Sequence, residues 1–242
     1  MVDDQLRHSY ERAGVHLPAL RRACVTGSGL PVWTLQPTRE PLASWRRLRG
    51  VHHRTGLWPF VAGTERVAEL WQDAATGHDP TTVERGLALD VRAFFAQRAA
   101  EHEAPDPATL TVDPAALAAA DNEPQFSFAS RETVIGLIQA RHGYEVPGLL
   151  SWKGAANYDF DAALHVAVLR SWQERYGAEL VTLTVDQIEL LVARPPQDLA
   201  TIAQVAVEMY GYCPDLVVQG TDTVEALANE YVPLRCWSFW WD

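Results

Sequence analysis

Few cysteines occur in this chain of 242 residues, and it contains no segment typical of an exported or membrane protein. Cys24, Cys213 and Cys236 form no Cys-x-x-Cys pair, which indicates free thiols in a reducing compartment. The acidic start of the chain is followed by no apolar segment of a secretory signal. No run approaches the ~20 apolar residues of a membrane helix. These absences predict a cytoplasmic protein that does not enter a membrane.

Positive charge is also scarce, because 20 Lys and Arg residues face 31 Asp and Glu residues, giving a net charge of −11. This balance disfavours binding to nucleic acid or to an anionic membrane, and it would suit a basic protein partner. Acidity that merely keeps the protein soluble is the alternative.

No His-Glu-x-x-His motif or Cys/His cluster occurs, so we expect no metal and no cofactor.

Hydrophobic residues are plentiful, at 48% of the chain with nine tryptophans, which suffices for a large core. Region 1–103 has the pattern of an N-terminal α+β unit. We expect helices over 3–13, 41–49 and 67–76, strands over 21–25, 30–35 and 57–62, and a long helix from a capping box at Thr81 and Glu84 through Phe95. The first two strands form a hairpin around a turn with two glycines. Residues 104–128, rich in Ala, Pro, Asp and Glu, are interpreted as a linker or covering segment.

Residues 129–242 are predicted to form a C-terminal α+β domain. The expected elements are strands over 133–139, 181–185, 188–192 and 236–241, helices over 161–176 and from 199 onward, and a short helix from a capping box at Asp222 to Tyr231. This order is that of the split βαβ, ferredoxin-like motif with one inserted helix. It predicts a four-stranded antiparallel sheet with helices on one face.

Several motifs in this half resemble a bacterial family of domains of unknown function with a C-terminal Phe-Trp-Trp-Asp signature. They are found at residues 165–172, 175–178, 192–196, 212–215, 219–220 and 237–242. The similarity covers about residues 130–242, and residues 57–60 look like the N-terminal part of longer members. The resemblance implies a bacterial, intracellular protein, and it supplies no activity, cofactor or catalytic residue.

Cys213 is a candidate nucleophile, with His165 as base and Asp215 as orienting group. The competing interpretation follows from spacing, because Cys213 continues the apolar stripe of residues 199, 202, 206 and 209. A buried thiol in apolar surroundings is inert. The pattern favours a core cysteine. Because the sequence contains no assembled catalytic motif, it favours a non-enzymatic role and leaves the enzyme hypothesis open as the alternative.

Alternation in the last strand places Trp237, Phe239 and Trp241 on one face and Cys236, Ser238 and Trp240 on the other. Since helices are expected on one face only, the second face is covered by the N-terminal region, by a partner or by a ligand. A binding surface would be built on Trp240, or on Trp237 and Trp241, with Trp152 and Asn157 on the nearby loop.

A concentrated basic patch, Arg46, Arg47, Arg49 and His53, could bind an anion or an acidic partner, or simply form a solvated helix face. Three functional hypotheses follow. The leading one is a protein-binding module of toxin-neutralising or adaptor type that uses an aromatic surface. The others are a hydrolase or transferase that uses Cys213 with His165, and an anion or nucleotide binder.

Overall fold

One mixed sheet of seven strands runs through the computed structural model, which describes residues 2–77, 79–128 and 132–241. Its strand order is β1-β2-β4-β3-β5-β6-β7, and every neighbouring pair is antiparallel except β3–β5. The strands are β1 (Leu20–Val25), β2 (Pro31–Leu35), β3 (Leu57–Gly63), β4 (Val134–Gln139), β5 (Ala178–Leu183), β6 (Gln187–Val192) and β7 (Cys236–Trp240).

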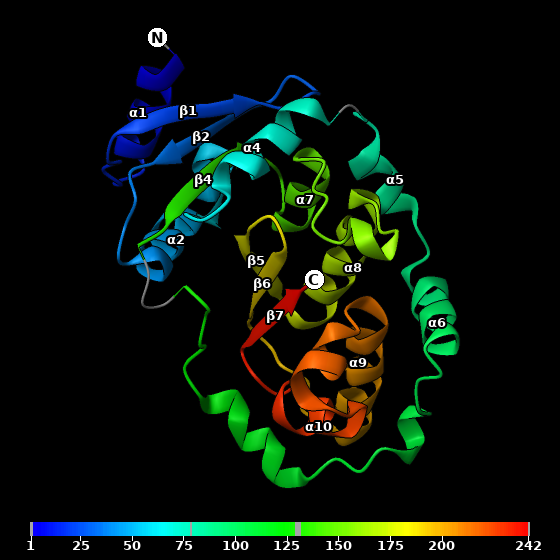
Figure 1. Cartoon of the computed structure of the whole chain (residues 1–242). Coiled ribbons are helices and arrows are strands. Elements are labelled where there is room, and N and C mark those ends of the chain that lie inside the picture. Colours follow the sequence, from blue (N-terminus) through cyan, green and yellow to red (C-terminus); the bar gives the residue numbers. More distant parts are fainter. Residues whose placement is uncertain (1, 78, 129–131, 242) are drawn as a thin grey trace.

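Helices surround this sheet on several sides (Figure 1). The α-helices are α1 (Val2–Arg12), α2 (Pro41–Gly50), α3 (His52–Thr55), α4 (Val67–Thr76), α5 (Thr82–Ala88), α6 (Val91–Glu101), α7 (Val146–Leu149), α8 (Ala162–Tyr176), α9 (Leu199–Tyr212) and α10 (Val224–Glu230). A π-helical turn, Leu216–Thr221, follows α9. Within the described residues, no helix combines the length and the apolar character needed to cross a bilayer.

Local sequence signals located most of these elements correctly. The predicted β1–β2 hairpin is present, and Gly29 in its turn has a φ of +88°, which favours glycine. Helix α8 begins at Asp161, whose carboxylate accepts hydrogen bonds from the amides of Ala163 and Leu164. It ends at Gly177, which has a φ of +63°.

One predicted helix is too long, and one predicted helix start is off by a residue. Thr81 is the N-cap residue of α5, as predicted, but its side chain makes no capping hydrogen bond and the predicted long helix is broken at Leu89. Asp90 accepts hydrogen bonds from two amides and starts α6 as a separate helix. In the last helix, Thr223 rather than Asp222 is the N-cap residue, because Asp222 has a φ of +63° and closes the preceding turn.

The ferredoxin-like order predicted for the C-terminal half is not the order of the sheet. Strand β3, from the N-terminal region, lies between β4 and β5, so β4 pairs with β2 and β3 and has no edge left for a C-terminal strand. Strands β5, β6 and β7 follow one another as a meander. Sequence order misled here because the partners of β4 come from far earlier in the chain.

Helices lie on both faces of the sheet rather than on one. Helices α8 and α9 cover the face of β7 that carries Phe239, which contacts Trp172 and Tyr212 at ring-centroid distances of 5.1 and 5.2 Å. On the opposite face, α1 and α2 pack a second core against β2 and β4, with Tyr10 and Leu48 buried. The predicted boundary between segments at 128/129 adjoins residues 129–131, which lie outside the described residues.

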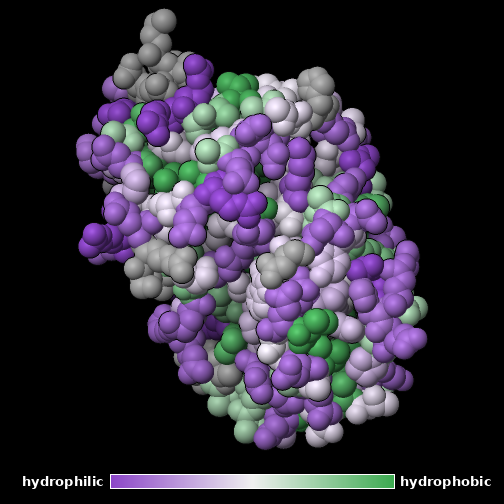
Figure 2. All heavy atoms as spheres, viewed as in Figure 1, coloured by the Kyte–Doolittle hydropathy of each residue, from purple (hydrophilic) through white to green (hydrophobic). Residues whose placement is uncertain are grey.

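The second face of the C-terminal strands is contacted by the chain's own segment before β4. This segment runs from the end of α6 past α9 and α10 and returns to the sheet (Figure 1). The amide of Ser127 in it donates to the carboxylate of Glu189 on β6 at 2.9 Å, and Phe126 and Phe128 are buried with stacked rings. Over this half of the molecule, Figure 2 shows hydrophilic residues with apolar areas between them.

The seam between β3 and β5 joins the two halves of the sheet through few backbone contacts. Its ladder consists of one residue pair, Val61 with Thr182. The indole N–H of Trp58 adds a hydrogen bond to the carbonyl of Leu180 at 3.1 Å. Arg49 of α2 donates from Nε and Nη2 to the carboxylate of Glu179, and its guanidinium lies 4.4 Å from the centre of the Trp58 ring. Side chains therefore supplement a short ladder.

Replacement of Trp58 by Phe is expected to lower the free energy of unfolding by about 2 kcal/mol or more. The substitution deprives a buried carbonyl of its donor and leaves unfilled space in the core. Trp71→Phe is the matched control, since that indole is partly exposed and its N–H has no hydrogen-bond partner among the described residues. Equilibrium urea unfolding measures both changes. Equal losses in the two variants would contradict the role given to Trp58.

Candidate functional site

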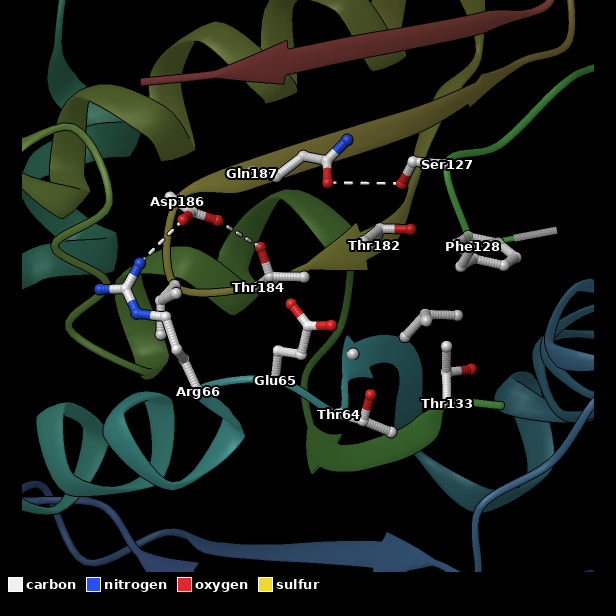
Figure 3. Close-up of a pocket in the computed structure, with 13 residues that line it drawn as sticks. Thr64, Glu65, Arg66, Ser127, Phe128, Thr133, Thr182, Thr184, Asp186 and Gln187 are labelled. Atoms are coloured by element: carbon white, nitrogen blue, oxygen red, sulfur yellow. Dashed lines mark hydrogen bonds and ion pairs between the residues drawn. The ribbon is translucent and has the colours of Figure 1, made fainter. Parts of the chain in front are cut away.

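A polar cavity of about 180 Å³ lies where the seam ends (Figure 3). Strands β3 and β5 are parallel, so both of their carboxyl ends, Gly63 and Leu183, reach the same edge. Ligands of open sheets commonly bind in the crevice outside the carboxyl ends of neighbouring parallel strands. The cavity therefore occupies a position where the backbone itself creates an opening.

The connection from β3 to α4 forms one wall. Gly63 has a φ of +73°, which allows the chain to turn away from the sheet. Thr64, Glu65 and Arg66 follow, and Arg66 also lies in the left-handed region, with a φ of +56°. Its guanidinium pairs with the carboxylates of Glu69 at 3.0 Å and Asp186 at 2.9 Å. Arg66 thus links this wall to the turn between β5 and β6, and its charge is already neutralised.

Hydroxyl and amide groups form the other walls. The hydroxyl of Thr184 donates to Asp186 at 3.1 Å, and the hydroxyl of Ser127 donates to the side-chain oxygen of Gln187 at 3.4 Å. Thr182 lies on β5 and Thr133 immediately before β4. Polar groups from four separate segments therefore converge on one cavity, as at sites that fix the orientation of a ligand.

A buried carboxyl group lies beneath the cavity wall. Glu189 is 1% exposed, and its two oxygens accept hydrogen bonds from the hydroxyl of Thr182 at 2.7 Å and from the amide of Ser127. Burial raises the pKa of Glu189 above its usual range, although these hydrogen bonds lower it in part. Glu189 consequently holds Thr182 in place through this hydrogen bond.

Glu65 supplies the uncompensated charge of the cavity. Its side chain is exposed, and Figure 3 shows its carboxylate pointing into the space between the two walls. No cationic side chain of the described residues lies within ion-pair distance of it, whereas Arg66 and Asp186 pair with each other. The cavity therefore offers a carboxylate and several hydroxyl groups to an incoming cation or hydrogen-bond donor.

The predicted nucleophile and base occupy the core. The thiol of Cys213 is fully buried and donates to the carbonyl of Trp240 at 2.9 Å, while burial raises its pKa to about 12. His165 is also fully buried, with Nδ1 2.6 Å from the hydroxyl of Tyr212 and a pKa lowered by burial to about 3. Asp215 accepts a hydrogen bond from Tyr158. The three side chains thus hydrogen-bond to other groups, in surroundings that suppress thiolate formation.

The aromatic residues expected at a binding surface divide into two sets. Trp152, Trp237 and Trp241 are at most 3% exposed and belong to the core. Trp240 is partly exposed, and Asn157 lies on an exposed turn. What remains of the aromatic surface is Trp240 beside the π-helical turn, whose Val218 is 69% exposed.

The basic patch is only partly available to a ligand. Arg49 pairs with Glu179 across the seam, whereas Arg46, Arg47 and His53 are exposed. In the portions of the chain that the structure describes, no three His, Cys, Asp or Glu side chains are grouped to hold a metal ion.

Reasoning from the sequence missed the cavity altogether. Glu189 lies between Ile188 and Leu190 on β6, and Thr182 lies between two apolar residues at the opposing position of β5. Polar residues at buried strand positions are expensive unless they are paired, so this coincidence was a usable signal. Glu65, in contrast, has no local signature, because only the pairing of β3 with β5 brings it to the site.

Fold and cavity define a mixed α/β protein with a polar recess at the junction of its two sheet halves. Residues 134–242 match the sequence profile of a domain of unknown function, DUF4253. The match begins with β4 and extends past β7, so β3 lies outside it, and its last residue, Asp242, lies outside the described residues. Searches among curated proteins and among solved structures found no match for the chain.

Because its pKa is raised in the folded protein, Glu189 contributes a stabilising free energy that decreases as pH rises. The folded protein holds this proton more tightly than the unfolded chain, so the contribution is full below the ordinary glutamate pKa of 4.5 and is lost as pH rises toward the folded value. Glu189→Gln mimics the neutral form. We expect the unfolding free energy of the wild type, minus that of the variant, to fall as pH rises above about 4.5. Urea unfolding at several pH values measures this difference; an increase with pH would contradict it.

Thiol reactivity separates a core cysteine from a nucleophile. Half-buried Cys24 is expected to react first with a disulfide reagent, while Cys213 and Cys236 react only as the protein unfolds, because burial raises the pKa of both thiols. Peptide mapping by mass spectrometry assigns the modified residue. Faster modification of Cys213 in the folded protein than in urea would restore the nucleophile hypothesis.

Proposed function

We propose that the protein is a binding module that receives a basic side chain of a partner protein in the cavity between β3 and β5. The observation that carries this proposal is the exposed carboxylate of Glu65, which points into a cavity lined by hydroxyl groups and has no cationic partner among the described residues. A lysine ammonium or an arginine guanidinium brings several N–H donors and one positive charge. The cavity supplies the complementary acceptors.

Charge and size both support a cationic side chain as the occupant. The chain carries a net charge of −11, which raises the local concentration of cations and speeds their association. A cavity of about 180 Å³ holds the end of one long side chain, and it is smaller than the 300–1,000 Å³ of sites for drug-sized molecules. A partner's side chain therefore suits the cavity better than a large free ligand.

Binding, rather than catalysis, is the role that the chemistry of the cavity favours. Its hydroxyl groups belong to Thr and Ser residues, and the one titratable group buried beside it, Glu189, is already hydrogen-bonded on both oxygens. Cys213 and His165 lie in the core and hydrogen-bond elsewhere. The toxin-neutralising or adaptor role follows as the kind of function that such a module serves, with the polar cavity in place of an aromatic surface.

The test uses the full-length protein and short peptides that carry one lysine or one arginine, with an alanine peptide of the same length and spermidine as comparisons. Amide chemical shifts are followed during titration. We expect the basic peptides to perturb Thr64, Thr184 and Gln187, and we expect Glu65→Gln to weaken binding about ten-fold or more, since a charge-assisted hydrogen bond is lost.

Glu230→Gln is the matched control, because it removes the same charge from an exposed residue at the end of α10. It should leave the affinity unchanged. Equal weakening by both variants would reduce the effect to general electrostatics and contradict the proposed site. Tighter binding of spermidine than of either peptide would show that the cavity takes a free amine instead of a protein side chain.

A further inference from the structure

The charge of this protein is divided unevenly along the chain. Residues 1–60 contain nine arginines and four acidic residues, a net charge of +5, whereas residues 61–242 contain 11 basic and 27 acidic residues, a net charge of −16. The total of −11 conceals this asymmetry. Residues 1–60 form α1, β1, β2, α2, α3 and most of β3, which lie together at one end of the molecule (Figure 1). The protein therefore has one basic end.

The arginines at this end are available to a partner. Arg46 and Arg47 on α2, Arg54 on α3 and Arg21 and Arg22 on β1 are exposed. Arg49 is paired with Glu179 and Arg39 lies 4.0 Å from Glu132, but no carboxylate of the described residues pairs with any of these five exposed arginines. Figure 2 shows strongly hydrophilic residues over this end, interrupted by small apolar areas. The guanidinium groups of these five arginines are therefore able to pair with the carboxylates of another molecule.

A partly apolar hollow lies beside Arg47. It has a volume of about 180 Å³ and is bounded by the segment before β1, the end of β2 and α2. Leu17, Leu35, Leu48 and Ile135 form the apolar part of its lining, and the polar part includes His16, Gln36, Thr38, Ser44 and Arg47. An apolar cavity of 150 Å³ in a protein core accommodates a benzene molecule, so this hollow can take one aliphatic or aromatic side chain. Its lining therefore combines apolar contact with polar groups and the cation of Arg47.

We propose that this basic end docks an acidic protein segment, whose apolar side chain enters the hollow while flanking carboxylates pair with Arg46 and Arg47. Guanidinium groups bind carboxylates through two parallel hydrogen bonds, and arginine is enriched at protein interfaces. The acidic remainder of the molecule orients an acidic partner toward this end by repulsion elsewhere. This site is separate from the cavity between β3 and β5 and does not depend on the function proposed for it.

An acidic protein suits this end better than a nucleic acid does. A nucleic acid is a long polyanion, and the net charge of −16 on residues 61–242 repels the part that extends beyond the patch. Single strands are bound by aromatic side chains on which bases stack. The tryptophans of this region, Trp33, Trp45 and Trp58, are at most 5% exposed and cannot stack on a base.

The experiment measures binding of fluorescent peptides to the full-length protein by anisotropy. The probe is an acidic peptide with a central leucine flanked by aspartates, compared with the same peptide carrying serine in place of leucine. A single-stranded oligothymidine is the nucleic-acid probe. We expect the leucine peptide to bind at least about ten-fold more tightly than the serine peptide, because the hollow buries the apolar side chain. We also expect its affinity to fall as salt is raised.

Arg46→Glu combined with Arg47→Glu should weaken binding of the leucine peptide at least about ten-fold, since like charges then oppose each other. Arg235→Glu is the matched control, an exposed arginine outside residues 1–60 that makes no ion pair with a described residue, and it should leave the affinity nearly unchanged. Both sites are exposed, so circular dichroism should show folded variants. The proposal is overturned if neither peptide binds, or if the two peptides bind equally. It is also overturned if the Arg46/Arg47 variant and the Arg235 variant lose equal affinity, or if the oligonucleotide binds more tightly than the leucine peptide.

Discussion

The pairing of β3 with β5 is the constraint on which the rest of this structure depends. One residue pair of parallel ladder joins the two halves of the sheet, and the indole of Trp58 and the Arg49–Glu179 ion pair reinforce it. The same pairing brings the carboxyl ends of both strands to one edge, where the polar cavity opens. A short ladder is what leaves room there, because longer pairing would continue across the opening. Strand pairing and the cavity therefore exclude each other at the same backbone positions.

Several tryptophans join separate segments of this fold. Trp45, Trp58 and Trp152 each donate the indole N–H to a backbone carbonyl of another segment, at Pro59, Leu180 and Thr184. A buried indole needs such a partner, since an unsatisfied donor in the core is costly. Large apolar area and one directed hydrogen bond let a single side chain hold two segments in a fixed register. The high tryptophan content thus reflects a sheet assembled from segments distant in sequence.

Most elements of the fold could be predicted from the sequence, because their causes are local. The caps at Asp161 and Gly177, the β1–β2 hairpin and the alternation of β7 all follow from residues within one or two turns of the backbone. The sheet order could not be predicted, because β3 shows no local sign that it lies between β4 and β5. The cavity was missed for the same reason: Glu65, Ser127 and Thr182 come from three distant segments. Cys213 was correctly favoured as a core residue, because helical spacing is again a local property.

The position of β3 also affects how the chain is made. Both of its neighbours in the sheet, β4 and β5, are synthesised later, so the strand leaves the ribosome with two unpaired edges and with Trp58 and Phe60 uncovered. Unpaired edges that carry apolar side chains are prone to aggregate, and non-local strand pairing is slow. The nascent chain is consequently exposed for as long as synthesis takes to reach β5. Chaperones that hold extended apolar segments are expected to act on this protein during that interval.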